Sequence, residues 1–323
     1  MTAAPREALT PTPTPLQPAL RFGAAIGREV WIKRDDIGSV GYAGNKIRKL
    51  EFLAPALGDA DTLLIVGALQ SNAARATAAF AAATGRRCVL VIPAERPAVA
   101  PPLEGNALLG ALFGAELRYL GAVDWAEAEA ASAEIAAELE SEGARCAVLP
   151  AGCSSPRGTL GFVAAHEELL RQLSGAGLEA AAIVHASSSC GTAAGLLLGR
   201  ALHGGPPIVS VDVGRLFEPV EDRILGLAAG AAELLGVAAR VGPADLGVTY
   251  DFIGEGYAKP TRACLEAIRL LAATEGIVCD PVYSGKALAA VASAPGSGPV
   301  VFWHTGGAQS VFTSAAAEAL VAS

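Results

Sequence analysis

Short runs of apolar and β-branched residues alternate along the chain with longer stretches of helical periodicity. Runs of the first kind predict strands, and apolar positions recurring every three or four residues predict amphipathic helices. Strands are expected at 28–33, 62–67, 87–92, 116–120, 146–149, 181–185, 207–213 and 298–303. Helices are expected at about 71–84, 125–142, 157–174, 191–203, 218–235, 259–275, 285–293 and 308–321. This alternation is typical of βα units on a mainly parallel sheet.

A further helix is expected just after the first strand, where Ile47, Leu50 and Leu53 recur at helical spacing. The turn before it is supplied by Gly38, Gly41 and Gly44. Asn45 is a plausible N-cap, and Lys46 then stands at the first helical position.

Lys46 stands in an unusual electrostatic position. A helix N-terminus carries partial positive charge, and Arg48 and Lys49 add to it, so the pKa of the Lys46 amine is expected to be lowered. A neutral amine beside an anion-attracting helix start suits Schiff-base chemistry with an aldehyde cofactor. The alternative is a solvated basic patch.

Length and composition indicate a large folded protein. The 323 residues suit one large or two medium domains, and with 52% hydrophobic and 17% charged residues a sizeable core can be buried. Only the first twenty residues look loose, because their Thr-Pro repeats favour extended chain. No signal peptide and no membrane-spanning run is recognised.

The cysteines and the net charge exclude several classes of function. The six cysteines show no Cys-x-x-Cys pairing and no nearby histidine cluster, so neither a metal site nor a disulfide framework is expected. A reducing cytoplasm fits this pattern. The net charge of −8 argues against nucleic acid as a partner.

Two segments with chemical potential follow predicted strands, where open α/β sheets bind ligands. In 67–72, Ser71 is placed to cap the next helix, and with Asn72 and the free helix N–H groups it could hold a substrate carboxylate. In 187–195, small and hydroxyl residues entering a helix suit a phosphate cradle, although the spacing fits neither the dinucleotide fingerprint nor the P-loop. A serine-rich turn without a ligand is the alternative.

Two later segments are also candidates. In 280–286, Tyr283 could serve in acid–base work and Ser284 could hydrogen-bond a ring nitrogen; a core tyrosine and a cap serine are the alternatives. In 302–307, two glycines let the backbone approach a flat ligand, and Trp303 and His304 are by default packing residues.

Together these segments resemble one family in its own order. The motifs are Gly44-Asn-Lys-x-Arg-Lys-Leu-Glu-Phe-Leu53, Gln70-Ser-Asn72, Ser189-x-Gly-Thr192, Asp280-Pro-Val-Tyr-x-Gly-Lys286 and Phe302-Trp-His-Thr-Gly-Gly307. They are similar to those of the D-cysteine desulfhydrase and 1-aminocyclopropane-1-carboxylate deaminase family, a branch of the tryptophan-synthase-β-like enzymes that use pyridoxal 5'-phosphate. The resemblance implies an α/β fold with two open, mainly parallel sheets flanked by helices. It also implies a large domain of residues 1–49 and 158–323, a small domain of residues 50–157, and a homodimer.

The resemblance also implies roles for single residues. Lys46 is the Schiff-base lysine, Asn72 contacts the phenolic oxygen of the cofactor, and Ser71 meets the substrate. The phosphate is held by Ser189, Cys190, Gly191 and Thr192, and the catalytic pocket is lined by Tyr257 and Tyr283. The sequence departs from the family pattern at Ala43 and Cys190, which replace glycines, and at Ala73, which replaces a polar residue.

The type of reaction rests on Ser284 and Thr305, where deaminases of the family carry glutamate and leucine. Either hydroxyl could contact the pyridine nitrogen, and a neutral partner leaves that nitrogen largely unprotonated, which suits β-elimination. The expected function is pyridoxal-phosphate-dependent β-elimination from D-cysteine or a similar β-substituted amino acid, giving pyruvate, ammonia and sulfide. The alternatives are an L-cysteate sulfo-lyase, a 1-aminocyclopropane-1-carboxylate deaminase and a non-catalytic small-molecule-binding relative.

Overall fold

A computed structural model describes residues 4–38, 40–98 and 102–321 of the chain. The strands of this part are β1 Leu16–Pro18, β2 Val30–Arg34, β3 Thr62–Val66, β4 Arg87–Ile92, β5 Glu116–Tyr119, β6 Cys146–Leu149, β7 Ala182–Ser187, β8 Ile208–Asp212, β9 Val248–Thr249 and β10 Val300–His304. The α-helices are α1 Leu20–Ile26, α2 Asn45–Leu53, α3 Asn72–Ala83, α4 Gly105–Leu112, α5 Trp125–Ser141, α6 Pro156–Ala176, α7 Gly191–His203, α8 Val220–Leu235, α9 Arg262–Glu275, α10 Ser284–Ala289 and α11 Ser314–Val321. Short 3₁₀ helices are η1 Val40–Tyr42, η2 Ala54–Ala56, η3 Ala151–Cys153, η4 Pro243–Asp245, η5 Val291–Ser293 and η6 Ala308–Phe312.

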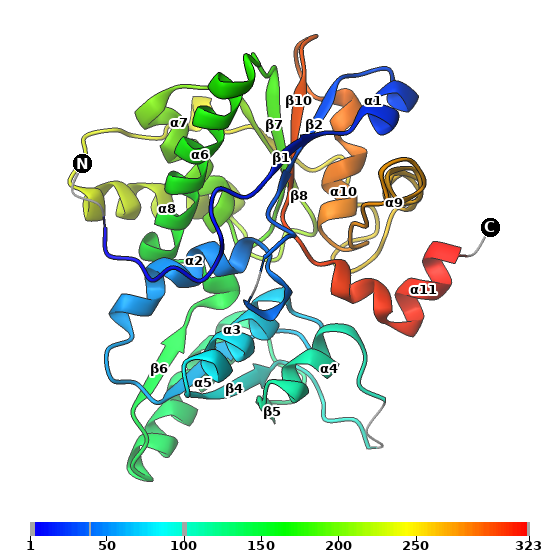
Figure 1. The fold of residues 1–323 in the computed structure, drawn as a ribbon. Helices are drawn as coiled ribbons and strands as arrows, with labels where there is room; N and C mark the ends of the chain where they lie inside the picture. The colour runs from blue at the N-terminus through cyan, green and yellow to red at the C-terminus, as the bar shows by residue number, and fades with distance from the viewer. Residues whose placement is uncertain (1–3, 39, 99–101, 322–323) are drawn as a thin grey trace.

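The larger sheet has the strand order β1-β2-β10-β7-β8-β9 and is parallel except for β1 (Figure 1). Helices α6, α7 and α8 cover one face, and α1, α9 and α10 cover the other. Because both faces are covered, the inner strands are mostly apolar, and every residue of β7 is buried.

The smaller sheet has the order β5-β4-β3-β6, is fully parallel, and lies below the larger one in Figure 1. Along β3, Leu63 and Ile65 pack on the core beneath α3, whereas Leu64 and Val66 pack on the core beneath α5. Helix α2 joins the two halves, because it packs against both α6 and α3. The prediction of an α/β fold with two mainly parallel sheets is therefore confirmed.

Each predicted strand and helix is found within a few residues of its expected position. Two predicted helices are interrupted: residues 285–293 divide into α10 and η5, and residues 308–321 divide into η6 and α11, with Thr313 in an extended conformation between them. Strands β1 and β9 and helices α1 and α4 were not predicted. The residue that precedes α1 is Ala19, and the residue that precedes α4 is Glu104. Neither side chain caps its helix, so no start signal marks either helix.

The expectation of a loose N-terminal segment is wrong for its second half. Thr14 is only 1% exposed, and residues 16–18 form the edge strand β1. Both belong to packed structure because a buried polar cluster holds Thr14 in place. Within the described part of the chain, no helix combines the length and the apolar character needed to cross a bilayer.

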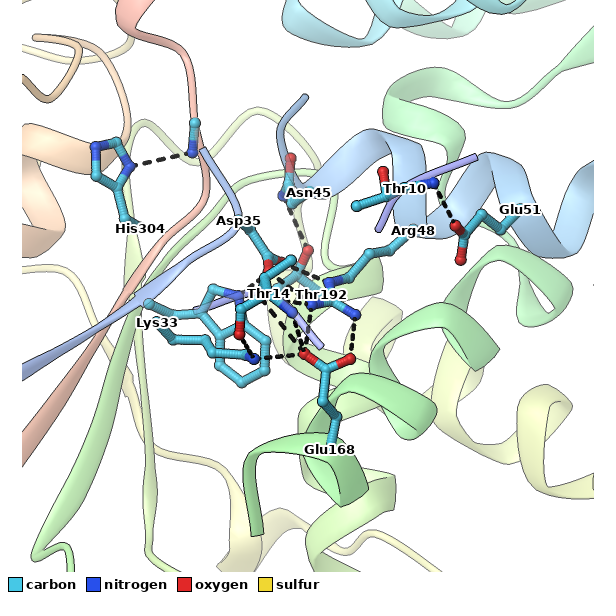
Figure 2. A network of polar contacts seen from close by, with 12 residues as sticks. Thr10, Thr14, Lys33, Asp35, Asn45, Arg48, Glu51, Glu168, Thr192 and His304 are labelled. Atoms are coloured by element: carbon cyan, nitrogen blue, oxygen red, sulfur yellow. Dashed lines mark hydrogen bonds and ion pairs between the residues drawn. The ribbon is translucent and has the colours of Figure 1, made fainter. Parts of the chain in front are cut away.

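That cluster, the strap network, consists of Thr14, Lys33, Asp35, Arg48 and Glu168 (Figure 2). The guanidinium of Arg48 donates to Asp35 at 2.8 Å and to Glu168 at 2.9 Å, and Lys33 pairs with Glu168 and donates to the Thr14 carbonyl at 2.7 Å. Two cations thus meet two carboxylates, and the network fixes α2 against β2 and α6. Arg48 is 4% exposed and Lys49 1% exposed, so the alternative of a solvated basic patch on α2 is wrong.

Candidate functional site

A cavity lies between the two sheets, where α2, α3 and α7 begin. Nine of the eleven predicted site residues line it: Lys46, Ser71, Asn72, Ser189, Cys190, Thr192, Tyr257, Tyr283 and Thr305. Gly191 and Ser284 do not line it. Residues far apart in the chain are therefore brought to one place, although their chemical roles stay predictions.

Lys46 reaches the cavity from the first turn of α2. The pKa of its amine is lowered, as expected, but the main cause is burial among the surrounding groups rather than the charges of the helix. The N-cap prediction for Asn45 is wrong. Gly44, with φ 102° and ψ 164°, is the last residue before the helix, and Asn45 is its first residue.

Because Asn45 does not cap the helix, its side chain is available to line the cavity. Its Nδ2 donates to Thr192 Oγ1 at 3.1 Å. A threonine hydroxyl that accepts this bond keeps its own proton for another acceptor. Thr192 stands in the first turn of α7, so that proton is available to an anion at this helix start.

Ser71 and Asn72 show the same arrangement at the start of α3. Ser71 caps the helix as predicted, because its Oγ accepts from the Ala74 N–H at 3.2 Å. Asn72 Oδ1 accepts from Asn106 Nδ2 at 2.9 Å. In both side chains the acceptor is engaged within the protein, so the remaining hydroxyl proton and amide N–H groups can be donated to a ligand. Asn106, on α4, was not found from the sequence, because α4 itself was not predicted.

Behind the turn 187–192 lies a second lysine, Lys49, whose contact with this turn was not predicted from the sequence. Lys49 Nζ donates to Ser154 Oγ at 2.8 Å, and Ser154 Oγ is 2.8 Å from Ser189 Oγ. Burial, followed by repulsion from Lys46, sets the pKa of Lys49 well below its ordinary value. Among the described residues no carboxylate forms an ion pair with it, in contrast to Lys33 and Arg48.

The spacing of Lys46 and Lys49, three residues apart on one helix, was the available signal that both face the same side. A buried ammonium without an acidic partner is costly, and an anion bound at the adjacent cavity would offset that cost. The hydroxyl of Ser187, which lines the same wall, is also buried without a hydrogen-bond partner in the structure. These groups fit a phosphate at the start of α7.

The backbone of this turn leaves little space. A Cβ at Gly191 would lie 2.7 Å from Ser154 Oγ and 3.1 Å from Lys49 Nζ, so only glycine fits there. Cys190 has φ 67° and Ala43 has φ 56°, so both residues that replace family glycines are in the left-handed region. At each of these two positions, a side chain in the left-handed region causes backbone strain of about 1–2 kcal/mol.

The two predicted tyrosines form a pair at the cavity. Tyr257 Oη and Tyr283 Oη share a short hydrogen bond, and their rings meet edge to face with centroids 5.8 Å apart. Burial raises the pKa of Tyr257 and raises that of Tyr283 well above its ordinary value. Both are therefore neutral phenols at neutral pH.

Ser284 is directed away from the cavity. Its Oγ donates to Asp280 Oδ2 at 2.5 Å and accepts from the Asp280 N–H at 2.9 Å. The other oxygen of Asp280 accepts from the Val282 and Tyr283 N–H groups at 2.8 and 2.6 Å, so this carboxylate shapes the turn. Thr305 faces the cavity, and no carboxylate is among the described residues that line it.

The end of β10 agrees with its predicted packing role. Trp303 and His304 are fully buried; Trp303 Nε1 donates to Asp35 at 2.8 Å, and His304 accepts from the Gly306 N–H at 3.2 Å (Figure 2). Gly306 lines the cavity, and a Cβ there would lie 2.8 Å from Gly44 Cα. The glycine therefore permits close approach of two chain segments beside the site.

An aromatic pair at the cavity was not predicted. Trp125 begins α5 above the smaller sheet, and Phe217 follows β8 of the larger sheet; their ring centroids are 5.7 Å apart. The pair joins the two halves of the protein beside the cavity. An isolated aromatic residue in a sequence reads by default as core, so no signal marked either residue.

Comparisons with known proteins identify the relatives of this chain. The sequence pattern of the family described as "Pyridoxal-phosphate dependent enzyme" matches residues 8–306. A D-cysteine desulfhydrase of Salmonella choleraesuis (strain SC-B67) is 38% identical over 323 residues, covering 97% of each chain. The crystal structure of an ACC deaminase homologue superposes with a TM-score of 0.86 at 39% identity, covering 95% of this chain and 93% of that chain. A fungal L-serine ammonia-lyase from Rhizomucor miehei, at 17% identity and a TM-score of 0.64, covers 94% of this chain and 96% of its own and shares the fold.

Proposed function

Because this chain belongs to the family of pyridoxal-phosphate-dependent enzymes, we propose that it eliminates the sulfur substituent of D-cysteine or a closely similar amino acid. It is a pyridoxal-phosphate-dependent lyase acting on small amino-acid substrates. The proposed products are pyruvate, ammonia and sulfide. D-Cysteine is chosen because it is named in the relative that is 38% identical.

One observation carries the proposal: the cavity presents donors whose acceptor atoms are already used inside the protein. Ser71, Asn72 and Thr192 each accept a hydrogen bond from a protein group and keep a proton for a ligand. With the buried ammonium of Lys49, they suit a ligand with several anionic groups. Pyridoxal phosphate and an amino acid together have a phosphate, a phenolic oxygen and a carboxylate.

We assign each set of donors to one of these three groups. Ser189, Cys190, Gly191 and Thr192 would hold the phosphate at the start of α7, with Lys49 as its buried countercharge. Asn72 would donate to the phenolic oxygen. Ser71 and the start of α3 would hold the substrate carboxylate. Lys46 would carry the cofactor on its amine.

When bound, pyridoxal phosphate withdraws electrons from the α-carbon of the substrate. Once the substrate amine has replaced it on the cofactor, the freed Lys46 Nζ would take the α-proton, a role that its lowered pKa favours because the amine is available as a base. The Cβ–S bond breaks with its electrons leaving on sulfur. The aminoacrylate that remains hydrolyses after release to pyruvate and ammonia.

The tyrosine pair is proposed as a hydrogen-bond donor and not as the base. Because burial raises the pKa of both phenols, a phenolate at rest is disfavoured. Tyr283, whose hydroxyl is held by Tyr257, can stabilise the departing sulfur by a hydrogen bond from its hydroxyl group. The base is therefore assigned to Lys46 rather than to a tyrosine.

Thr305 is assigned as the hydrogen-bond partner of the pyridine nitrogen. Thr305 lines the cavity, whereas the hydroxyl of Ser284 is engaged with Asp280. A deaminase of 1-aminocyclopropane-1-carboxylate would need a carboxylate at that nitrogen, and no described lining residue provides one. The elimination reaction is favoured for this reason.

The domain organisation, the oligomeric state and the cellular location are proposed on the same basis. We propose a large domain of residues 1–49 and 158–323 and a small domain of residues 50–157, with the cofactor between them. We also propose a homodimer located in the cytoplasm, where the six cysteines, all free thiols in the structure, would remain reduced.

The test is a panel of D- and L-β-substituted amino acids, including L-cysteate and 1-aminocyclopropane-1-carboxylate, with pyruvate, 2-oxobutanoate and the released anion measured separately. D-Cysteine should give equal amounts of pyruvate and sulfide. Borohydride reduction should attach the cofactor to Lys46 in the natural protein and leave Lys46→Ala unlabelled. Efficient 2-oxobutanoate production, or labelling of Lys33, Lys49 or Lys286, would contradict the proposal.

A further inference from the structure

Lys286 is a fully buried lysine that the proposed reaction does not use. It lies on α10, and its Nζ donates to three backbone carbonyls: Val213 at 3.0 Å, Ile253 at 2.7 Å and Gly256 at 2.9 Å. Among the described residues it forms no ion pair. Three carbonyl oxygens around one small cation are the ligands that a protein offers to a bound monovalent metal ion.

The geometry identifies the group as an ammonium. A protonated lysine has three donors, whereas a neutral amine has two and would turn its lone pair toward one of the carbonyls. Burial lowers the pKa of Lys286, and the nearby charges of Asp212 and Asp280 oppose this effect. With three acceptors at hydrogen-bond distance, the protonated form is the one that satisfies every contact.

The three carbonyls belong to the segments that carry the tyrosine pair. Ile253 and Gly256 lie in the loop that contains Tyr257, and Lys286 stands one turn after Tyr283. Val213 follows β8, and a Cβ at the next residue, Gly214, would lie 2.6 Å from the Cβ of Tyr257. The loop therefore rests directly on the end of β8, held there by one buried cation.

We propose that Lys286 is a positioning residue that fills a three-carbonyl cation site and thereby holds Tyr257 against Tyr283. The ammonium acts as a tethered substitute for a free monovalent cation. Without it, three buried carbonyls lose their donors, the loop of Tyr257 moves, and the phenol of Tyr283 loses its partner. The catalytic consequence rests on the proposed function, whereas the cation site itself does not.

The test replaces the tethered cation by a free one. Lys286→Ala, reconstituted with pyridoxal phosphate, is measured in lithium, potassium and ammonium chloride at equal ionic strength. In lithium, kcat for sulfide release should fall up to about 100-fold with a smaller change in KM, as expected for a misplaced catalytic group. Potassium or ammonium, which match the lost group in size and charge, should restore most of kcat with saturation.

A second readout does not depend on activity. The Tm of Lys286→Ala, with and without the cofactor, should rise by roughly 5 °C from lithium to saturating potassium or ammonium. The natural protein should show no such difference, because its site is already filled. If the natural protein lacks elimination activity, the proposed function fails, but this measurement still decides the cation site.

Two further variants serve as controls. Lys286→Met fills the space without charge or donors, so it should lose kcat and show no response to any of the cations. Lys259→Ala removes an exposed lysine of the same loop and should behave as the natural protein. Full kcat in Lys286→Met overturns the proposal. So does a Lys286→Ala protein whose solubility, Tm and kcat are the same in lithium as in potassium and ammonium.

Discussion

Lys46 and Lys49 lie on one face of α2, yet only Lys46 opens onto the cavity. Lys49 is enclosed, with hydroxyl and carbonyl partners but no described acidic one. A buried cation of this kind destabilises the protein without its ligand and stabilises the complex with an anion. Replacing Lys49 by an apolar residue should therefore raise the stability of the apoprotein and lower its affinity for the cofactor.

Lys49→Met tests this opposition. The apoprotein should become more stable by roughly 1–4 kcal/mol, as when other buried charges are replaced by apolar groups. Affinity for pyridoxal phosphate should fall about ten- to a hundred-fold, which corresponds to the loss of about 1.5–3 kcal/mol. Urea unfolding and cofactor titration measure the two effects, with Lys259→Met as the control.

The same lysine gives a pH dependence with a defined sign. The pKa of Lys49 in the folded protein is well below the ordinary 10.5, so between these values the unfolded chain binds a proton that the folded protein does not. The stability of the natural apoprotein, relative to Lys49→Met, should then rise with pH up to about 10.5. An unchanged difference across this range, together with unchanged cofactor affinity, would contradict the assignment of Lys49.

Much of the site could be predicted at the scale of residues, because glycines, hydroxyls and a lysine at strand-to-helix turns have few structural uses. Side-chain direction could not be predicted. Ser284 and Thr305 were equivalent in the sequence, and only the turn of Asp280 directs Ser284 away from the cavity. Asn106 and Lys49 were missed because their importance depends on contacts with residues distant in the chain.

At the scale of helices and strands, the strap network stands out as a buried cluster of charged residues. Glu168 on α6 balances Lys33 of β2 and Arg48 of α2. Glu168→Gln would leave two buried cations with one carboxylate and should destabilise the protein by about 3–5 kcal/mol. The control is Glu167→Gln on the same helix, whose side chain is 47% exposed and pairs with Arg171, and it should change stability by less than about 1 kcal/mol.

The hydrogen bonds and charges of Arg48 and Lys33 outweigh burial and lower the pKa of Glu168 from 4.5 to about 2. Its stabilisation is therefore complete above pH 4.5 and is lost as the pH falls toward 2. Glu168→Gln should lack this acid-dependent loss. Unfolding monitored from pH 7 to pH 2 compares the two proteins, and parallel curves would refute the role given to Glu168.

Periodicity was sufficient for the long elements and failed for the short ones. Strands buried on both faces, such as β3 and β7, are mostly apolar runs with turn residues at their ends. The edge strand β1 and helix α1 depend on the strap network and on β2, so nothing local in their sequence specifies them.

For the whole molecule, a bound cofactor would connect the smaller sheet, through α3, with the larger sheet, through α7. Saturation at about 100 times the dissociation constant should stabilise the folded protein by about 2.7 kcal/mol. The Tm of the apoprotein should rise with added pyridoxal phosphate in differential scanning calorimetry, and Lys46→Ala should show a smaller rise. A Tm that does not depend on the cofactor would mean that it does not bind between the sheets.

The position of β10 in the middle of the larger sheet affects how the protein is made. All strands of the smaller sheet lie within residues 62–149, so they leave the ribosome together, whereas β2 must wait for β10, which begins at residue 300. At roughly 5–20 residues per second, that interval is about 10–50 s. During synthesis β1 can protect one edge of β2, but its other edge stays open and can pair with another chain until the last strand arrives.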